Sequence, residues 1–150
     1  MMTTKNLRNF GLAGLAALTL AGCESLPGNV YHPLNGTTWR LVDVETSGTS
    51  TRLNPELQAR HTLTFERGGR LNMQLDCNRG SASWEASLPQ TYNGSISISQ
   101  VASTRAFCPD PTFGEALAAD LPSSSAYTLT PDGRGLVIRT ARIVYAFERN

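Results

Sequence analysis

The segment HTLTFERGGRLNMQL (residues 61–75) decides the fold, because its apolar residues alternate on both sides of a glycine pair. The alternating residues are Leu63, Phe65, Leu71, Met73 and Leu75. A period of two is typical of a strand with one buried face. Arg67-Gly68-Gly69-Arg70 has the composition of a hairpin connection. The segment therefore predicts two antiparallel strands, His61–Glu66 and Leu71–Leu75, with one face on a core.

Strand patterns continue on both sides of this hairpin. The further segments rich in β-forming or alternating apolar residues are Thr37–Val44, Ser81–Ala86, Gly94–Ser99, Ala126–Thr130, Leu136–Thr140 and Ile143–Phe147. Pro131-Asp132-Gly133 and Thr140-Ala141-Arg142 are typical of turns between them. Many short strands joined by turns predict an antiparallel sheet that curls into a partly closed barrel.

One helix is expected within this pattern. Asp110 is a suitable N-cap, and Pro111 suits the first helical position. Apolar residues then recur at four-residue spacing from Phe113 to Leu121, and Pro122 ends the pattern. The predicted fold class is α+β: a β-rich, antiparallel, barrel-like sheet with one packed helix.

The N-terminus has the features of a bacterial lipoprotein signal. Lys5 and Arg8 precede the apolar run Phe10–Leu20, and the lipobox Leu20-Ala21-Gly22-Cys23 ends it. The run is too short for a transmembrane helix, which needs about 18 apolar residues. We expect a signal peptide at 1–22, a lipidated tether at 23–35 that begins with acylated Cys23, and a domain at 36–150. An ordinary secreted protein with a cysteine near its cleavage site is the alternative.

The residue after Cys23 bears on the destination of the protein. Lipoprotein sorting in Gram-negative bacteria retains proteins with Asp at this position in the inner membrane, and here the residue is Glu24. We therefore expect a lipid anchor at the periplasmic face of the outer membrane, with the inner membrane as the alternative.

Cys77 and Cys108 form an even pair in an oxidising compartment, so a disulfide is the leading interpretation. Two buried free thiols or two metal ligands remain open as alternatives. A metal site needs more ligands, and His32 and His61 are each isolated in sequence. We expect neither a metal nor a cofactor.

Charge and motifs exclude several classes of function. Without Lys5 and Arg8, which belong to the expected signal peptide, the chain has 11 basic and 12 acidic residues. It contains no cluster of basic residues that would indicate nucleic-acid binding. The chain has no Gly-x-Ser-x-Gly, His-Glu-x-x-His or phosphate-binding glycine loop. We therefore expect no enzyme.

Two groups of residues are candidates for binding. If Cys77 and Cys108 are bonded, a polar patch able to hold a carboxylate or phosphate can form from Asp76, Asn78, Arg79 and Arg105. The favoured alternative is a structural loop in which the Asp pairs with an Arg. An apolar cavity can be lined by Trp39, Phe65, Trp84, Phe107 and Phe113. The favoured alternative is that these rings fill the core.

Three segments carry a family resemblance, which covers roughly residues 34–148. Asp76-Cys77-Asn78-Arg79-Gly80 resembles the Gly-Cys-Asn motif of META/HslJ-type domains, and STRAFCP (residues 103–109) resembles their Thr-x-Met-Ala-Cys-Pro segment. LNGTTWRL (residues 34–41) resembles their first strand. Asp76 replaces the usual Gly, and Ala106-Phe107 replaces Met-Ala. The resemblance implies a small, barrel-like α+β domain found in envelope lipoproteins and heat-inducible proteins, with no established reaction.

Together these features predict a non-catalytic, membrane-anchored periplasmic lipoprotein with a binding or structural role, in the context of envelope stress. Its expected partners are the membrane, through the N-terminal lipid, and an envelope protein or apolar ligand. The alternative is a barrel that binds an apolar peptide or acyl chain, as secretin-pilot lipoproteins of similar shape do. An empty apolar pocket on the order of a few hundred Å³ would favour that alternative.

Overall fold

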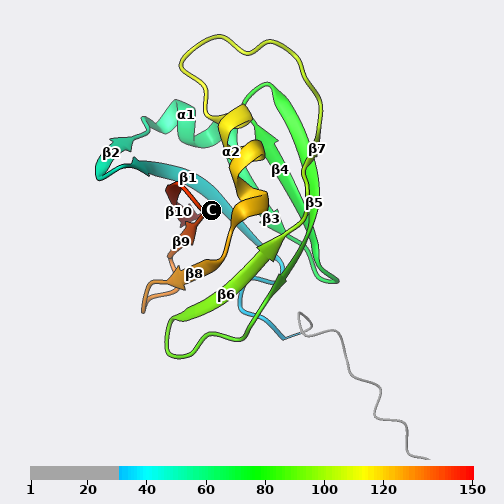
Figure 1. The fold of residues 1–150 in the computed structure, drawn as a ribbon, viewed down its shortest axis with the longest axis vertical. Coiled ribbons are helices and arrows are strands. Elements are labelled where there is room, and N and C mark those ends of the chain that lie inside the picture. Colours follow the sequence, from blue (N-terminus) through cyan, green and yellow to red (C-terminus); the bar gives the residue numbers. More distant parts are fainter. Residues whose placement is uncertain (1–30) are drawn as a thin grey trace, which may run out of the picture.

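A computed structural model describes residues 31–150 and shows an antiparallel barrel with helical elements at its surface (Figure 1). Eight of the described strands close in the order β1-β3-β4-β5-β6-β8-β9-β10, and β10 pairs back to β1. The closing strands are β1 (Thr37–Thr46), β3 (His61–Phe65), β4 (Arg70–Leu75), β5 (Asn78–Ala86), β6 (Asn93–Ile98), β8 (Ala126–Leu129), β9 (Gly135–Arg139) and β10 (Ile143–Arg149). The predicted α+β barrel-like fold is confirmed.

The hairpin that the sequence placed at the centre is present as β3 and β4. Leu63 lies opposite Met73, and Phe65 lies opposite Leu71. Gly68 and Gly69 have φ values of 88° and 84°, in the left-handed region that favours glycine. The glycine pair therefore sets the register that turns the apolar face of both strands toward the core.

Large side chains fill the inside of the barrel. Those with at most 2% of their surface exposed include Trp39, Phe65, Trp84, Tyr127, Tyr145 and Phe147. The rings of Phe65 and Trp84 meet edge to face with their centroids 5.0 Å apart. Alternate residues of the closing strands point inward, so each of these eight strands contributes to one continuous cluster. For three of the five aromatic residues singled out from the sequence, Trp39, Phe65 and Trp84, filling the core is the observed role.

The predicted helix is shorter than expected. The helix α2 spans Gly114–Asp120, and Asp110 does not cap it. Instead, the backbone N–H of Phe113 donates to the His61 ring, which draws the residues before the helix onto the barrel. At the other end, Pro122 lies inside η1 (Leu121–Ser123), a 3-10 helix that continues directly from α2.

The start of α2 lies very close to β4. A Cβ atom added to Gly114 would lie 2.4 Å from the carbonyl oxygen of Leu75, a distance that real Cβ atoms essentially never show. Glycine therefore allows the helix to approach the backbone of the strand at this point.

Three short elements were not predicted. They are β2 (Thr49–Arg52), α1 (Pro55–Arg60) and β7 (Ala102–Ser103). All four residues of β2 are exposed, so no alternation marked it. The start of α1 did carry a readable signal, because Asn54 accepts a hydrogen bond from the N–H of Leu57 and Pro55 occupies the first turn. The strand β5 also begins earlier than expected, at Asn78.

The packed part of the chain begins before Gly36. His32 and Leu34, which the sequence placed in the tether, are buried. Leu34 packs in the core cluster, and the His32 ring lies within hydrogen-bond distance of the Ser87 carbonyl. The expected signal peptide, acylated Cys23 and most of the tether lie outside the described residues. Within residues 31–150, no helix is long and apolar enough to cross a membrane.

The barrel has two ends that matter below. We name as the upper end the one that carries α1, the β4–β5 connection and residues 104–113 (Figure 1). The lower end carries residues 31–36, the β3–β4 connection and the β5–β6 connection.

Candidate functional site

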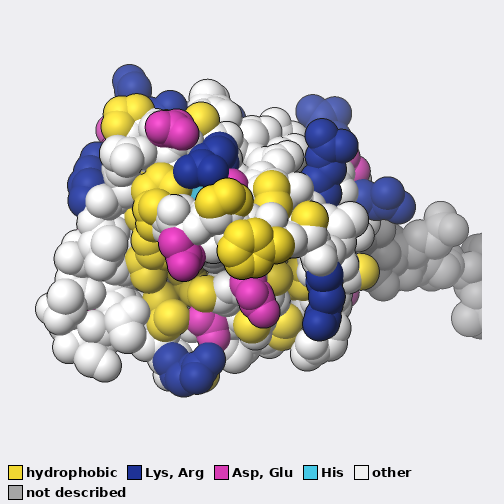
Figure 2. Space-filling view, turned by 90° about the horizontal axis from the view of Figure 1, so that it is seen from above, with side chains coloured by type: hydrophobic (Ala, Val, Ile, Leu, Met, Phe, Trp, Pro, Cys, Tyr) yellow, Lys and Arg dark blue, Asp and Glu magenta, His cyan; other side chains and the backbone are white. Residues whose placement is uncertain are grey.

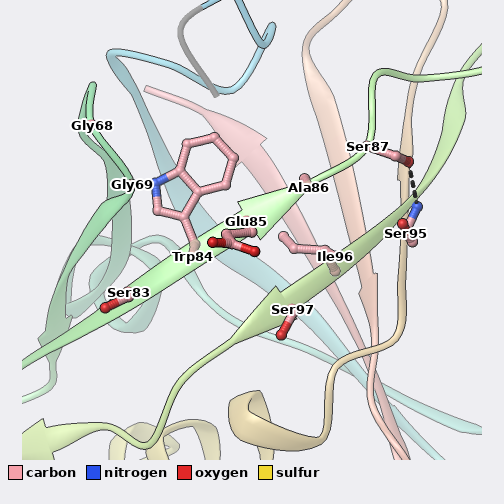
Figure 3. Close-up of a pocket in the computed structure, with 10 residues that line it drawn as sticks. All are labelled: Gly68, Gly69, Ser83, Trp84, Glu85, Ala86, Ser87, Ser95, Ile96 and Ser97. Carbon is pink, nitrogen blue, oxygen red and sulfur yellow. Dashed lines mark hydrogen bonds between the residues drawn. The ribbon is translucent and has the colours of Figure 1, made fainter. Parts of the chain in front are cut away.

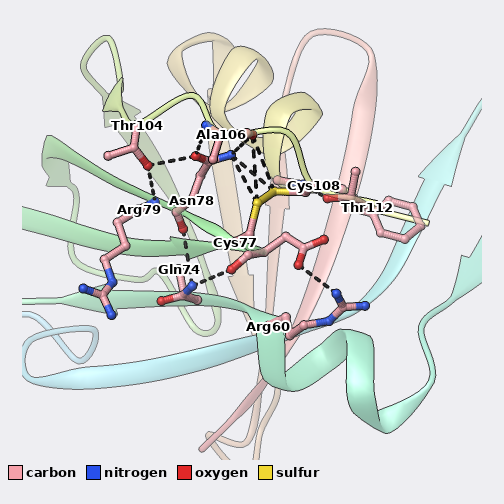
Figure 4. The surroundings of a disulfide bond; sticks show 12 residues. Arg60, Gln74, Cys77, Asn78, Arg79, Thr104, Ala106, Cys108 and Thr112 are labelled. Carbon is pink, nitrogen blue, oxygen red and sulfur yellow. Dashed lines mark hydrogen bonds and ion pairs between the residues drawn. A yellow bond between two sulfur atoms is a disulfide. The ribbon is translucent and has the colours of Figure 1, made fainter. Parts of the chain in front are cut away.

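A disulfide organises the upper end. The sulfur atoms of Cys77 and Cys108 are bonded, and their Cα atoms lie 5.7 Å apart (Figure 4). Cys77 lies in the connection between β4 and β5, and Cys108 lies in the long segment that leads to α2. The bond therefore ties the residues before the helix to the rim of the barrel.

Asn78 clamps the same segment beside the disulfide. Its Oδ1 accepts hydrogen bonds from the N–H of Ala106 (2.7 Å) and the hydroxyl of Thr104 (2.9 Å). Its Nδ2 donates to the carbonyl of Ala106 at 2.9 Å. The backbone N–H of Arg79 donates to Thr104 Oγ1 at 3.0 Å. The disulfide and these hydrogen bonds together hold residues 104–108 (Figure 4).

The four residues of the predicted polar patch have different roles. Asp76 is buried, and its Oδ1 lies 2.9 Å from Nη1 of Arg60, which is not one of the four predicted residues. Asn78 binds the backbone of the 104–108 segment. Arg79 and Arg105 are exposed, and their side chains form no ion pair with another residue of the described part. The arrangement resembles the structural alternative, with Arg60 as the partner of the Asp.

His61 connects both helices to the barrel. Its Nδ1–H donates to the carbonyl of Leu57 at 2.7 Å, and its Nε2 accepts from the N–H of Phe113 at 3.1 Å. This pair of bonds requires the neutral ring with its proton on Nδ1. Burial lowers the pKa of His61, against smaller upward effects of the Leu57 carbonyl and of Asp76.

His32 plays a similar role at the lower end. Its Nδ1 accepts from the N–H of Leu34 at 3.2 Å, so the proton of the neutral ring lies on Nε2. Nε2 is 2.9 Å from both the Ser87 carbonyl and the Tyr127 hydroxyl. Burial lowers the pKa of His32 and raises the pKa of Tyr127 to about 12. The ring therefore closes the lower end in its uncharged form.

Because His32 and His61 have lowered pKa values, we expect acid to destabilise the domain. In the folded protein, the pKa of each histidine lies below 6.5, the pKa of histidine in the unfolded chain. When the pH falls below 6.5, the unfolded state therefore binds more protons than the folded state. The stabilisation that the two neutral histidines provide is complete above pH 6.5. It is lost as the pH falls from 6.5 toward their pKa values in the folded protein. We expect the free energy of unfolding to fall by at most about 1.4 kcal/mol per pH unit for each histidine. Urea unfolding between pH 7.5 and 5 measures the slope, and His61→Gln should reduce it. An unchanged slope in that variant would contradict the assignment.

A third buried group lies at the end of α2. Asp120 accepts from the hydroxyl of Tyr145 at 2.9 Å and from Arg142 at 2.8 Å. Burial and this hydrogen bond raise the pKa of Tyr145, and the hydrogen bond to Asp120 raises the pKa of Arg142. The Asp120 carboxylate therefore ties the helix to β10. Among residues 31–150, no three His, Cys, Asp or Glu residues gather as candidate metal ligands.

A groove of about 460 Å³ runs between α2 and the clamped segment at the upper end. Its apolar lining includes Leu75, Val101 and Ala118, and Arg105 and Glu115 add charge. The ring of Phe107 also lines it and is 90% exposed. Figure 2, which views the molecule from above, shows apolar side chains gathered near the middle of this face among charged ones.

Phe107 differs from both expectations for the aromatic residues. It neither fills the core nor faces a closed cavity, because the disulfide and the Asn78 clamp hold its backbone outside the barrel. Phe113 packs against the core from the partly buried surface. The backbone that carries the exposed Phe107 ring is thus held in place on both sides by Ala106 and Cys108.

A second groove, of about 570 Å³, lies lower on the barrel, between the β3–β4 connection and strands β5 and β6 (Figure 3). Trp84 lies at its base and is 1% exposed. The polar lining is mainly serine: Ser83, Ser87, Ser95 and Ser97. Figure 3 shows Ser87 and Ser95 joined by a hydrogen bond, and the backbone N–H of Ser95 is its donor.

Comparison with known proteins places the fold. The family model described as META domain matches residues 32–150. No curated protein matches the chain. The NMR structure of a protein from Burkholderia xenovorans is similar over 99% of both chains, with a TM-score of 0.57 and 18% identity. The crystal structure of a DUF4847 family protein from Bacteroides vulgatus covers 77% of this chain and 93% of its own, with a TM-score of 0.51 and 14% identity.

Proposed function

The chain belongs to the META domain family, and from this premise we propose that it is an envelope lipoprotein whose domain acts as a non-catalytic binding module. The lipid on Cys23 holds the protein in the membrane. The groove at the upper end receives an apolar segment of another envelope protein, and envelope stress is the setting in which this binding matters.

The sequence supports the anchor and its location. The charged start, the 11-residue apolar run and the lipobox stand in the order that lipoprotein processing requires. Each buried CH₂ of an acyl chain contributes ~0.8 kcal/mol, so several chains on one cysteine give a stable anchor. Glu24 favours export to the outer membrane, where the domain faces the periplasm.

The use of the buried titratable groups supports a non-catalytic role. Asp76 pairs with Arg60, and Asp120 binds Tyr145. His32 and His61 each use both ring nitrogens in hydrogen bonds to the chain itself. Perturbed groups at an active site usually face a cleft, where substrate can reach them. These groups instead join elements of the fold.

The observation that carries the binding proposal is the exposed ring of Phe107, which lies beside the apolar groove on a tightly held stretch of backbone. Large exposed aromatic rings are frequent anchors of protein interfaces. Cys108 and Asn78 hold the neighbouring backbone, so little conformational freedom remains to be lost when a partner binds. Arg105 and Glu115 beside the groove can orient the partner by charge.

Cys23→Ser should abolish acylation and release the processed domain from membranes. Labelled palmitate and membrane fractionation measure both effects, and sucrose-gradient fractions of the wild type test the outer-membrane location. Cys77→Ser is the matched control, because it removes a different cysteine and should leave the label in place. Palmitate label on the Cys23→Ser protein, or no label on the wild type, would contradict the lipoprotein proposal.

A photoreactive phenylalanine analogue at residue 107 should crosslink to an envelope protein in intact cells. The same analogue at exposed Thr51, in β2, is the matched control. Ala119→Arg, on the exposed surface of α2 that lines the groove, should abolish the adduct by filling the groove. An adduct of one defined mass at 107 and none at 51 supports the proposal. Equal yields at both positions, or an adduct insensitive to Ala119→Arg, would contradict it.

A further inference from the structure

Apolar side chains gather at the lower end as well. Within residues 31–150, the exposed large hydrophobic side chains are Tyr31 (81%), Leu88 (60%), Tyr92 (40%) and Phe107 (90%). Phe107 belongs to the upper end, and the other three belong to the lower end (Figure 1). Three of the four thus share a region that the proposed binding groove does not use.

Hydrogen bonds place these three residues in one region. The His32 ring binds the Ser87 carbonyl at 2.9 Å, so the chain next to Tyr31 lies against the chain next to Leu88. Tyr92 lies in the same β5–β6 connection as Leu88, which the Gln90–Asn93 bridge folds into a tight turn. Tyr31, Leu88 and Tyr92 are therefore exposed at the same end of the barrel, and together they are named here the lower apolar surface.

Charged side chains lie in the adjoining connection. The N–H of Gly36 donates to the Phe65 carbonyl at 2.7 Å, so the β3–β4 connection lies against the start of the described chain. Glu66 and Arg67 are exposed in this connection, and Arg70, the first residue of β4, is exposed directly after it. Arginine beside tyrosine and leucine is the composition that proteins present to the headgroup region of a bilayer.

The length of chain before this surface determines what it can reach. Cys23 precedes Tyr31 by eight residues. Eight residues span at most ~30 Å when fully extended. A lipid on Cys23 therefore keeps the lower apolar surface within ~30 Å of the bilayer, and any protein partner would have to compete with the membrane for it.

We infer that the lower apolar surface docks the domain directly onto the bilayer that holds its lipid. The inference rests on the proposed acylation of Cys23 and adds a second, non-covalent contact. Tyr31 and Tyr92 sit at the level of the headgroups, Leu88 enters the boundary with the acyl chains, and Arg67 faces lipid phosphates. The contact gives the anchored domain one orientation.

This orientation has a consequence for the groove. The strand β5 runs from Asn78, beside the disulfide, to Ala86, beside the lower apolar surface. Nine strand residues span about 30 Å. Docking of the lower end therefore directs Phe107 and the groove away from the membrane, toward the periplasm.

The test uses acylated, mature protein in vesicles of phosphatidylethanolamine and phosphatidylglycerol that contain nitroxide-labelled lipids. Leu88→Cys supplies a single free thiol, because Cys23 is acylated and Cys77 is bonded to Cys108. A polarity-sensitive fluorophore on this thiol should shift to the blue and be quenched by the nitroxide several-fold more than the same fluorophore in Phe107→Cys. Phe107→Cys is the matched control because Phe107 is also exposed but belongs to the upper end.

Mass spectrometry of the N-terminal cysteine in the same samples shows whether Cys23 is acylated. This measurement distinguishes a failure of the proposed lipid anchor from a failure of the docking inference. Unmodified Cys23 would contradict the proposed anchor. Acylated protein with equal quenching at residues 88 and 107 would overturn the docking inference and leave the anchor intact. Tyr31→Ser combined with Tyr92→Ser, in the Leu88→Cys background, should reduce the quenching while circular dichroism stays unchanged. Full quenching in that variant would also overturn the inference.

Discussion

Cys77→Ala should lower the free energy of unfolding by ~3–4 kcal/mol, because it removes a crosslink whose ends lie 31 residues apart and so releases chain entropy in the unfolded state. Cys108→Ala removes the same crosslink and should have the same effect. The double variant should cost little more than either single variant, since the two residues act as one unit. Urea unfolding under non-reducing conditions measures all three.

The reduced wild-type protein provides the control for this prediction. With a reductant present, its midpoint should move to that of Cys77→Ala, and the variant itself should not respond to the reductant. The folded barrel should persist, because the Asn78 clamp and the His61–Phe113 hydrogen bond also hold the segment. A wild-type midpoint that is insensitive to reductant would contradict a stabilising disulfide.

Asp120→Ala should destabilise the domain by ~2–4 kcal/mol, because it leaves the buried hydroxyl of Tyr145 without its acceptor and opens a small cavity. Arg142→Ala is the matched control on the same carboxylate. The Arg142 side chain is 77% exposed, so water screens its pairing with Asp120 and its loss should cost clearly less than the loss of Asp120.

A double-variant cycle isolates the buried hydrogen bond. Adding Tyr145→Phe to Asp120→Ala removes the unsatisfied hydroxyl, so the pair should cost clearly less than the sum of the two single variants. Thermal and urea unfolding measure the three free energies. Additive costs would show that the Tyr145 hydroxyl gains little from Asp120.

The barrel itself was predictable because local patterns specify it. The alternation around Gly68 and Gly69 defined β3 and β4 before any tertiary contact was considered, and the turns at 131–133 and 140–142 separated β8, β9 and β10. The family motif around Cys77 and the segment ending at Pro109 indicated the META domain, which the family model confirms over residues 32–150.

The contacts of the candidate site were harder to predict, because they join residues far apart in sequence. Asp76 is hydrogen-bonded to Arg60, which is 16 positions away in sequence, and His61 is hydrogen-bonded to Phe113, which is 52 positions away. The residues next to each of them in sequence do not indicate which distant residue will be its partner. Asn54-Pro55 did mark the start of α1, and counting that cap would have placed Arg60 at the end of a helix near the β4–β5 connection.

By itself, the sequence determined the antiparallel strands, because period-two alternation and turn residues act over a few neighbouring positions. The lipobox at residues 20–23 is an equally local pattern, and lipidation of Cys23 stays a prediction. Only the tertiary structure decided that Phe107 stays exposed while Trp39 and Trp84 fill the core. It also decided that His32 closes the lower end and that α2 starts at Gly114 rather than after Asp110. These outcomes depend on how closely distant segments approach one another, and a local pattern contains no information about that distance.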